Sequence, residues 1–178
     1  ATFMPEARSA WRAARWGSVG GLGAALAVLV ALAIVGPGQH TLWRSDAVGA
    51  VVGLLVAFIG WVTERYSQPY LAGEPGEAAC LRWLMATLAA VMVVVASNNL
   101  LVLALAWMAS SLALHRLLLF FGERPAARIA AHKKYLAARA ADLCMAGAVG
   151  LLYLAFGTLQ IDTLLALAGT GWVLVSSA

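Results

Sequence analysis

Five side chains that could carry or stabilise charge share one stripe of a long helical segment. In the segment from Pro125 to Phe156 they recur at alternating steps of four and three residues, which places them on one helix face: Arg128, His132, Tyr135, Arg139 and Asp142. Beyond Asp142 the segment continues as an apolar run that is typical of a bilayer span. Because ionisable groups inside a span often mark an ion path, proton or ion movement is the leading functional hypothesis.

Two charged pairs on this segment have both functional and structural interpretations. Arg139 and Asp142 are three residues apart, so they can pair and thereby lower the cost of entering low dielectric. The pair could switch beside a proton path or could stabilise a membrane boundary, and the sequence leaves both open. Lys133 and Lys134 are adjacent, which is more typical of lysines that reach toward headgroups at a cytoplasmic interface.

Two further residues are candidates for an ion pathway on other segments. His115 lies near the end of an apolar span and is followed by Arg116. Histidine titrates near neutral pH and can relay protons, although a hydrogen-bonded structural histidine is the commoner case. Asp46 opens another span, where a helix N-cap is a simpler explanation than a coupling role. No Cys or His cluster predicts a metal or redox site, so we expect no catalytic residue and no bound metal in this chain.

The composition excludes a soluble domain. Of 178 residues, 63% are hydrophobic and 11% are charged, and the mean hydropathy is +0.87. The formal net charge of +4 is typical of loop charges that orient a membrane protein, and we do not expect nucleic-acid binding.

The hydropathy pattern predicts an all-α polytopic transmembrane bundle. Five apolar segments are long enough, or nearly so, to span a bilayer: Gly17 to Val35, Asp46 to Val62, Leu81 to Ala96, Leu100 to Phe121 and Arg139 to Phe156. A sixth, Leu164 to Val175, is interpreted as an amphipathic or partial helix or as an incomplete span. We expect residues 1–16 to be a basic cytoplasmic segment and residues 17–178 to be the transmembrane domain, because Lys and Arg alternate between loops.

Three motifs in this order resemble the antiporter-like membrane subunits of respiratory complex I and the Mrp antiporters. They are Ala96-Ser-Asn-Asn-Leu-Leu-Val-Leu-Ala-Leu-Ala-Trp107, Ala130-Ala-His-Lys-Lys-Tyr-Leu-Ala-Ala-Arg-Ala-Ala-Asp142 and Phe156-Gly-Thr-Leu159. The resemblance implies that Lys133, Arg139 and Asp142 match the family's Lys, Arg and Asp, and that Asp46 matches an acidic residue opening an earlier span. Since family members have about a dozen or more spans, we expect the chain to hold only their early part.

A departure from the family pattern indicates a particular branch. Met108 stands where the family places a functional glutamate after the tryptophan, and the following Ser110-Ser-Leu-Ala-Leu-His115-Arg116 resembles the membrane subunit of DAB inorganic-carbon accumulation complexes, the DabB or MpsA type. That resemblance implies a large zinc-containing, carbonic-anhydrase-like partner of the DabA type. It also implies that catalysis and zinc reside in the partner, with no cofactor in this chain.

The sequence therefore predicts a membrane subunit for energy-coupled uptake of CO2 or bicarbonate in a bacterial inner membrane, with a cytoplasmic N-terminus. We expect an ion pathway for protons or sodium ions that comprises His115, Lys133, Lys134, Arg139, Asp142 and Asp46, and partner docking at Arg124 and Arg128. One alternative is a proton-translocating antiporter-like subunit of a complex I or Mrp-type assembly. Another is a non-conducting membrane anchor.

Overall fold

The fold consists of long helices that run side by side. The computed structural model describes residues 4–36, 38–39, 43–72, 74, 76–120 and 125–176. Six helices lie within these residues: α1 (Met4–Val35), α2 (Ala47–Leu71), α3 (Glu77–Ala96), α4 (Leu100–Leu118), α5 (Pro125–Phe156) and α6 (Ile161–Ser176). The short strands β1 (Gly38–Gln39) and β2 (Arg44–Ser45) form an antiparallel pair between α1 and α2.

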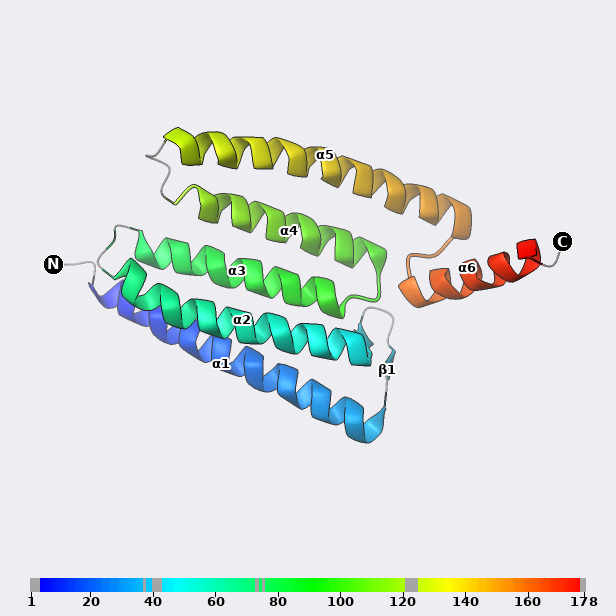
Figure 1. Ribbon diagram of the computed structural model, residues 1–178, viewed down its shortest axis with the longest axis horizontal. Coiled ribbons are helices and arrows are strands. Elements are labelled where there is room, and N and C mark those ends of the chain that lie inside the picture. The colour runs from blue at the N-terminus through cyan, green and yellow to red at the C-terminus, as the bar shows by residue number, and fades with distance from the viewer. Residues whose placement is uncertain are drawn as a thin grey trace.

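Five of the helices are long and apolar enough to cross a membrane, and α6 lies apart from them. The first five run alternately up and down in chain order, each packed on the next, and α1 also contacts α3. Figure 1 shows this row from α1 to α5, with α6 extending beyond the end at which α5 finishes. The expected all-α polytopic membrane fold is confirmed.

The helix bounds differ from the predicted spans mainly on the side where α1 begins. The long segment from Pro125 to Phe156 is one helix, as the sequence predicts. In contrast, α2 continues to Leu71, nine residues past its predicted end at Val62, and it contains Pro69. Proline lacks an N–H, so the carbonyl of Arg65 one turn earlier has no helical donor there. Since α1 is continuous through residues 16 and 17, the membrane boundary at residue 16 stays a prediction.

The turns at the opposite end are set by capping side chains and by glycines. Asp46 caps α2 by accepting from the Gly49 N–H at 3.0 Å, as its position predicts. Asn99 caps α4 through the Leu101 and Val102 N–H groups. Gly36 and Gly157 follow the ends of α1 and α5 with φ of 91° and 67°, a left-handed conformation that glycine adopts without steric cost.

The buried core is small and lies on the side where α1 begins. Trp11, Ala14, Leu71, Cys80 and Leu81 form a buried cluster, and the Trp11 indole N–H donates to the Glu77 carboxylate. Elsewhere most large apolar side chains on the five spans are exposed. Such an exterior fits contact with lipid tails or with further helices.

Candidate functional site: a polar interface between α4 and α5

The face of α5 that packs on α4 carries polar groups along its first half. Buried or half-buried side chains recur on α5 at steps of three and four: Ala131, Lys134, Tyr135, Ala138, Arg139 and Asp142. This face overlaps the charged stripe that the sequence predicts, with Tyr135, Arg139 and Asp142 common to both. Arg128 and His132, at the start of that stripe, are exposed.

Arg139 and Asp142 form the expected ion pair, and most of it is buried. The Arg139 Nη2 lies 2.6 Å from the Asp142 Oδ2, and the two side chains are 26% and 5% exposed. The Arg139 guanidinium also lies over the Tyr135 ring, 5.2 Å from its centroid. Because a lone charge is costly in low dielectric, each partner offsets the burial of the other.

Lys134 and His115 make further contacts between α4 and α5, one to two helical turns from the Arg139–Asp142 pair. Lys134 Nζ on α5 donates to the Ser111 carbonyl at 3.0 Å and lies 3.4 Å from the Ser111 hydroxyl on α4. The His115 ring lies 4.7 Å from the Tyr135 ring and meets the His132 ring edge-on at 6.2 Å. Four predicted pathway residues, His115, Lys134, Arg139 and Asp142, are therefore brought to one helix interface.

The remaining predicted site residues lie elsewhere. Lys133 is exposed although it neighbours Lys134, because successive helix positions point about 100° apart. Arg128 is exposed near the start of α5, where it is accessible to a partner, whereas Arg124 lies outside the described residues. Asp46 begins α2, at the end of the bundle away from the end of α4 that carries His115.

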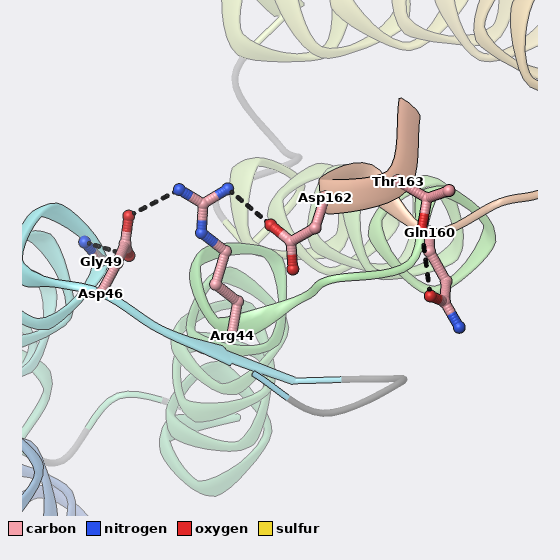
Figure 2. Close-up of polar contacts among 6 residues, drawn as sticks. All are labelled: Arg44, Asp46, Gly49, Gln160, Asp162 and Thr163. Atoms are coloured by element: carbon pink, nitrogen blue, oxygen red, sulfur yellow. Dashed lines mark hydrogen bonds and ion pairs between the residues drawn. The ribbon is translucent and has the colours of Figure 1, made fainter. Parts of the chain in front are cut away.

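Asp46 instead belongs to a separate ion-pair network. Figure 2 shows the Arg44 guanidinium between two carboxylates, 2.9 Å from Asp46 Oδ2 and 3.3 Å from Asp162 Oδ1. Asp162 lies in the first turn of α6, where the Thr163 hydroxyl also donates to Gln160 at 3.3 Å. The sequence places Arg44 beside Asp46 but gives no sign of Asp162, since that contact depends on how α6 is placed.

Backbone contacts fix α6 against the turn between α3 and α4. The Leu100 N–H donates to the Leu159 carbonyl and the Ile161 N–H donates to the Asn98 carbonyl, both at 2.9 Å. The Ser97-Asn98-Asn99 turn is therefore more than the tight reversal that its sequence predicts. It holds together the ends of α3, α4, α5 and α6.

Glu64 on α2 is a buried carboxylic acid that the sequence interpretation missed. Its side chain is 0% exposed. An acidic residue within an otherwise apolar helix could have identified Glu64 as a candidate. The predicted span, however, ended two residues before Glu64. Among the described residues no group of three or more His, Cys, Asp or Glu could hold a metal ion.

The α4/α5 interface brings together several groups with proton-transfer chemistry. Imidazole, carboxylate and ammonium groups can each bind and release a proton, and the arginine charge can stabilise an anion beside it. A family model described as NADH:quinone oxidoreductase/Mrp antiporter, transmembrane, matches residues 97–177, which include this interface.

Relatives of two kinds match the chain. A probable inorganic carbon transporter subunit DabB from Hydrogenovibrio crunogenus is 52% identical over 105 residues, 58% of this chain and 20% of the relative. The resemblance to antiporter-like subunits of the DabB type is confirmed. The probable subunit DabB2 from Halothiobacillus neapolitanus is 39% identical over 112 residues, 63% of this chain and 20% of the relative.

The chain also resembles a subunit of a redox complex. NADH-quinone oxidoreductase subunit L from Escherichia coli is 28% identical over 123 residues, 69% of the chain and 20% of that subunit. The chain spans about one fifth of the length of each of these three relatives. These similarities suggest a transporter subunit rather than a catalytic one.

Proposed function

We propose that the chain is the early part of the membrane subunit of an energy-coupled inorganic carbon uptake complex. The observation that carries this proposal is the 52% identity to a probable inorganic carbon transporter subunit DabB. In this role the subunit conducts protons or sodium ions, and the ion flow drives CO2 hydration in a large zinc-containing, carbonic-anhydrase-like partner of the DabA type. No zinc is proposed in this chain.

In the proposed mechanism Asp142 is the carboxylate that receives the proton. Proton binding neutralises its charge and weakens its ion pair with Arg139, whose N–O distance is 2.6 Å. The released guanidinium raises the positive potential beside Tyr135 and the neighbouring Lys134. His115, in ring contact with Tyr135, is the next group able to take up or release a proton.

The proposed orientation places the N-terminus on the cytoplasmic side of a bacterial inner membrane. Arginines gather at the end of the bundle where α1 begins, whereas only Arg44 stands at the other end among the described residues. Basic residues favour the cytoplasmic side. The exposed Arg128 then faces the cytoplasm, where the catalytic partner is proposed to dock.

Two experiments test the proposal. Affinity purification of the native full-length subunit in mild detergent, with mass spectrometry and zinc analysis, is expected to recover a large zinc-bearing partner. Asp142→Asn is expected to abolish carbon uptake while the complex still assembles, and Glu74→Gln, at an exposed loop carboxylate, is the matched control. Wild-type uptake by Asp142→Asn would contradict the role of Asp142.

A redox-driven antiporter-like subunit is the second candidate. The family description and the 28% identity to NADH-quinone oxidoreductase subunit L favour it. Copurification of flavin and iron–sulfur subunits, together with dependence on a quinone-reducing complex, would support this function instead. A non-conducting anchor would keep full function after neutral substitutions at His115, Arg139 and Asp142, provided that it assembled.

A further inference from the structure

Glu64 is buried in the candidate membrane span α2, and no basic side chain described by the structure forms an ion pair with it. It lies seven residues before the end of α2 at Leu71, so it is about 10 Å along the helix from that end. Its side chain is 0% exposed, and no ion pair joins it to a Lys, Arg or His among the described residues. An ionised carboxylate in such surroundings is far more costly than the neutral acid.

Three arginines on the helices around Glu64 contact other groups. Arg15 on α1 donates to Gln68 at 3.0 Å. Arg65 on α2 lies over the Trp61 ring, 5.8 Å from its centroid, and Arg82 on α3 donates to the Ala78 carbonyl at 3.3 Å. Among the described residues, Glu64 therefore has a hydrogen-bond partner but no ion pair with a basic side chain.

One hydroxyl group connects Glu64 to its surroundings. The Ser18 Oγ lies 3.4 Å from Glu64 Oε2 and 3.1 Å from the Arg15 carbonyl, while Glu64 Oε1 is buried without a hydrogen-bond partner. A hydroxyl has one proton to donate, so it can serve only one of these two acceptors at a time. When Glu64 is neutral, its Oε2–H can donate to Ser18 Oγ while Ser18 donates to the Arg15 carbonyl. When Glu64 is ionised, Ser18 can rotate its proton toward Oε2.

The same heavy-atom arrangement thus accommodates both protonation states of Glu64. We propose that Glu64 is a proton-binding site on α2, which gains and loses its proton through the Ser18 hydroxyl. Ser18 also lines a cavity of about 910 Å³ between α1, α2 and α3, to which Ser9 and Arg82 add polar groups and Gly17 and Gly21 leave room. We expect water that enters this cavity to exchange protons with Ser18.

This site is distinct from the α4/α5 interface, because α3 lies between α2 and α4 (Figure 1). The inference deepens the proposed function, on which it rests, by adding a proton-binding residue near the end of the bundle where α1 begins. It is tested separately, by following protonation of the Glu64 carboxyl group, and this measurement does not require carbon uptake.

The test is infrared spectroscopy of the full-length subunit in lipid vesicles, with and without carbon-13 labelling of glutamate. We expect a carbonyl stretch of a protonated carboxylic acid that shifts on labelling, declines as pH rises and is lost in Glu64→Gln. Glu74→Gln, at an exposed loop carboxylate, should leave this pH-dependent band unchanged.

A chemical probe provides a second measurement. Dicyclohexylcarbodiimide is apolar and adds the O–H of a protonated carboxylic acid across one of its C=N bonds, and the product rearranges to a stable N-acylurea. We expect mass spectrometry to find this adduct on Glu64 and not on Asp142, whose carboxylate is paired with Arg139.

Specific outcomes overturn the inference. A Glu64 band that is present at every pH, or absent at every pH at which the protein stays folded, would show that the residue does not exchange a proton. If the zinc-bearing partner fails to copurify while the Glu64 band still titrates, the proposed carbon uptake fails and proton binding by Glu64 stands.

Discussion

Lys134 on α5 binds Ser111 on α4, with its Nζ 3.0 Å from the carbonyl oxygen and 3.4 Å from the hydroxyl oxygen. This contact crosses the helix interface that also contains the Arg139–Asp142 pair. The neighbouring Lys133 is exposed. Two adjacent lysines of the same motif therefore have opposite environments, and a pair of matched variants can separate their roles.

Lys134→Met is expected to lower carbon uptake by about tenfold or more, since a hydrogen bond to a charged group contributes about 1.5–3 kcal/mol and 1.4 kcal/mol is a factor of ten. Lys133→Met is expected to keep wild-type uptake. Both variants are measured in whole cells at equal levels of assembled complex. The reverse result would favour Lys133, which matches the family's lysine by sequence.

The Arg139–Asp142 pair can be tested for separate structural and functional roles. Asp142→Asn leaves the buried part of Arg139 without its counter-charge, and we expect a loss of stability of about 1–3 kcal/mol. The double variant Arg139→Gln with Asp142→Asn removes both charges, so we expect it to recover part of that stability while uptake stays abolished. Thermal unfolding in detergent and uptake assays provide the two measurements. Recovered uptake in the double variant would indicate a purely structural pair.

Asp46 is predicted to act as a helix cap and ion-pair partner rather than as a proton carrier. Asp46→Asn retains an oxygen that can accept from the Gly49 N–H, and we expect uptake to remain close to wild type. Asp46→Ala loses the cap and should cost about 1 kcal/mol more in unfolding free energy. A loss of uptake in Asp46→Asn at normal stability would restore the pathway role that the sequence suggests.

Two glycines of α2 are expected to differ in the side chains that they tolerate. A Cβ at Gly60 would lie 2.9 Å from Leu88 Cδ1, whereas at Gly53 the nearest such atom, Val95 Cγ1, is 4.0 Å away. Gly53→Ala should therefore stabilise the helix by up to about 1 kcal/mol. Gly60→Ala should gain less, because Leu88 must move, and Gly60→Val should destabilise the protein. Equal melting temperatures for Gly53→Ala and Gly60→Val would contradict this packing.

The fold was more predictable than the site because different forces determine them. Hydropathy and proline placement predict the whole of α5, from Pro125 to Phe156. The same reasoning ended α2 too early, since Glu64 and Arg65 look like a loop until packing with α1 buries the glutamate. Because the predicted span ended before Glu64, this residue was not among the predicted site residues.

Within the site, contacts along one helix could be predicted and contacts between helices could not. Arg139 and Asp142 are three residues apart, so helix geometry alone brings them together. Lys134 and Ser111 are 23 residues apart, and their contact depends on the angle and register at which α4 and α5 pack. The link from Arg44 to Asp162 likewise depends on the position of α6.

The network of Arg44 with Asp46 and Asp162 also contributes a charge at its end of the bundle. One guanidinium opposes two carboxylates, so the three groups carry a formal charge of −1. A charge of this sign attracts cations and repels anions over a Debye length of about 8 Å at physiological ionic strength. Added salt should therefore slow the capture of cations at this surface without altering the chemistry of the buried groups.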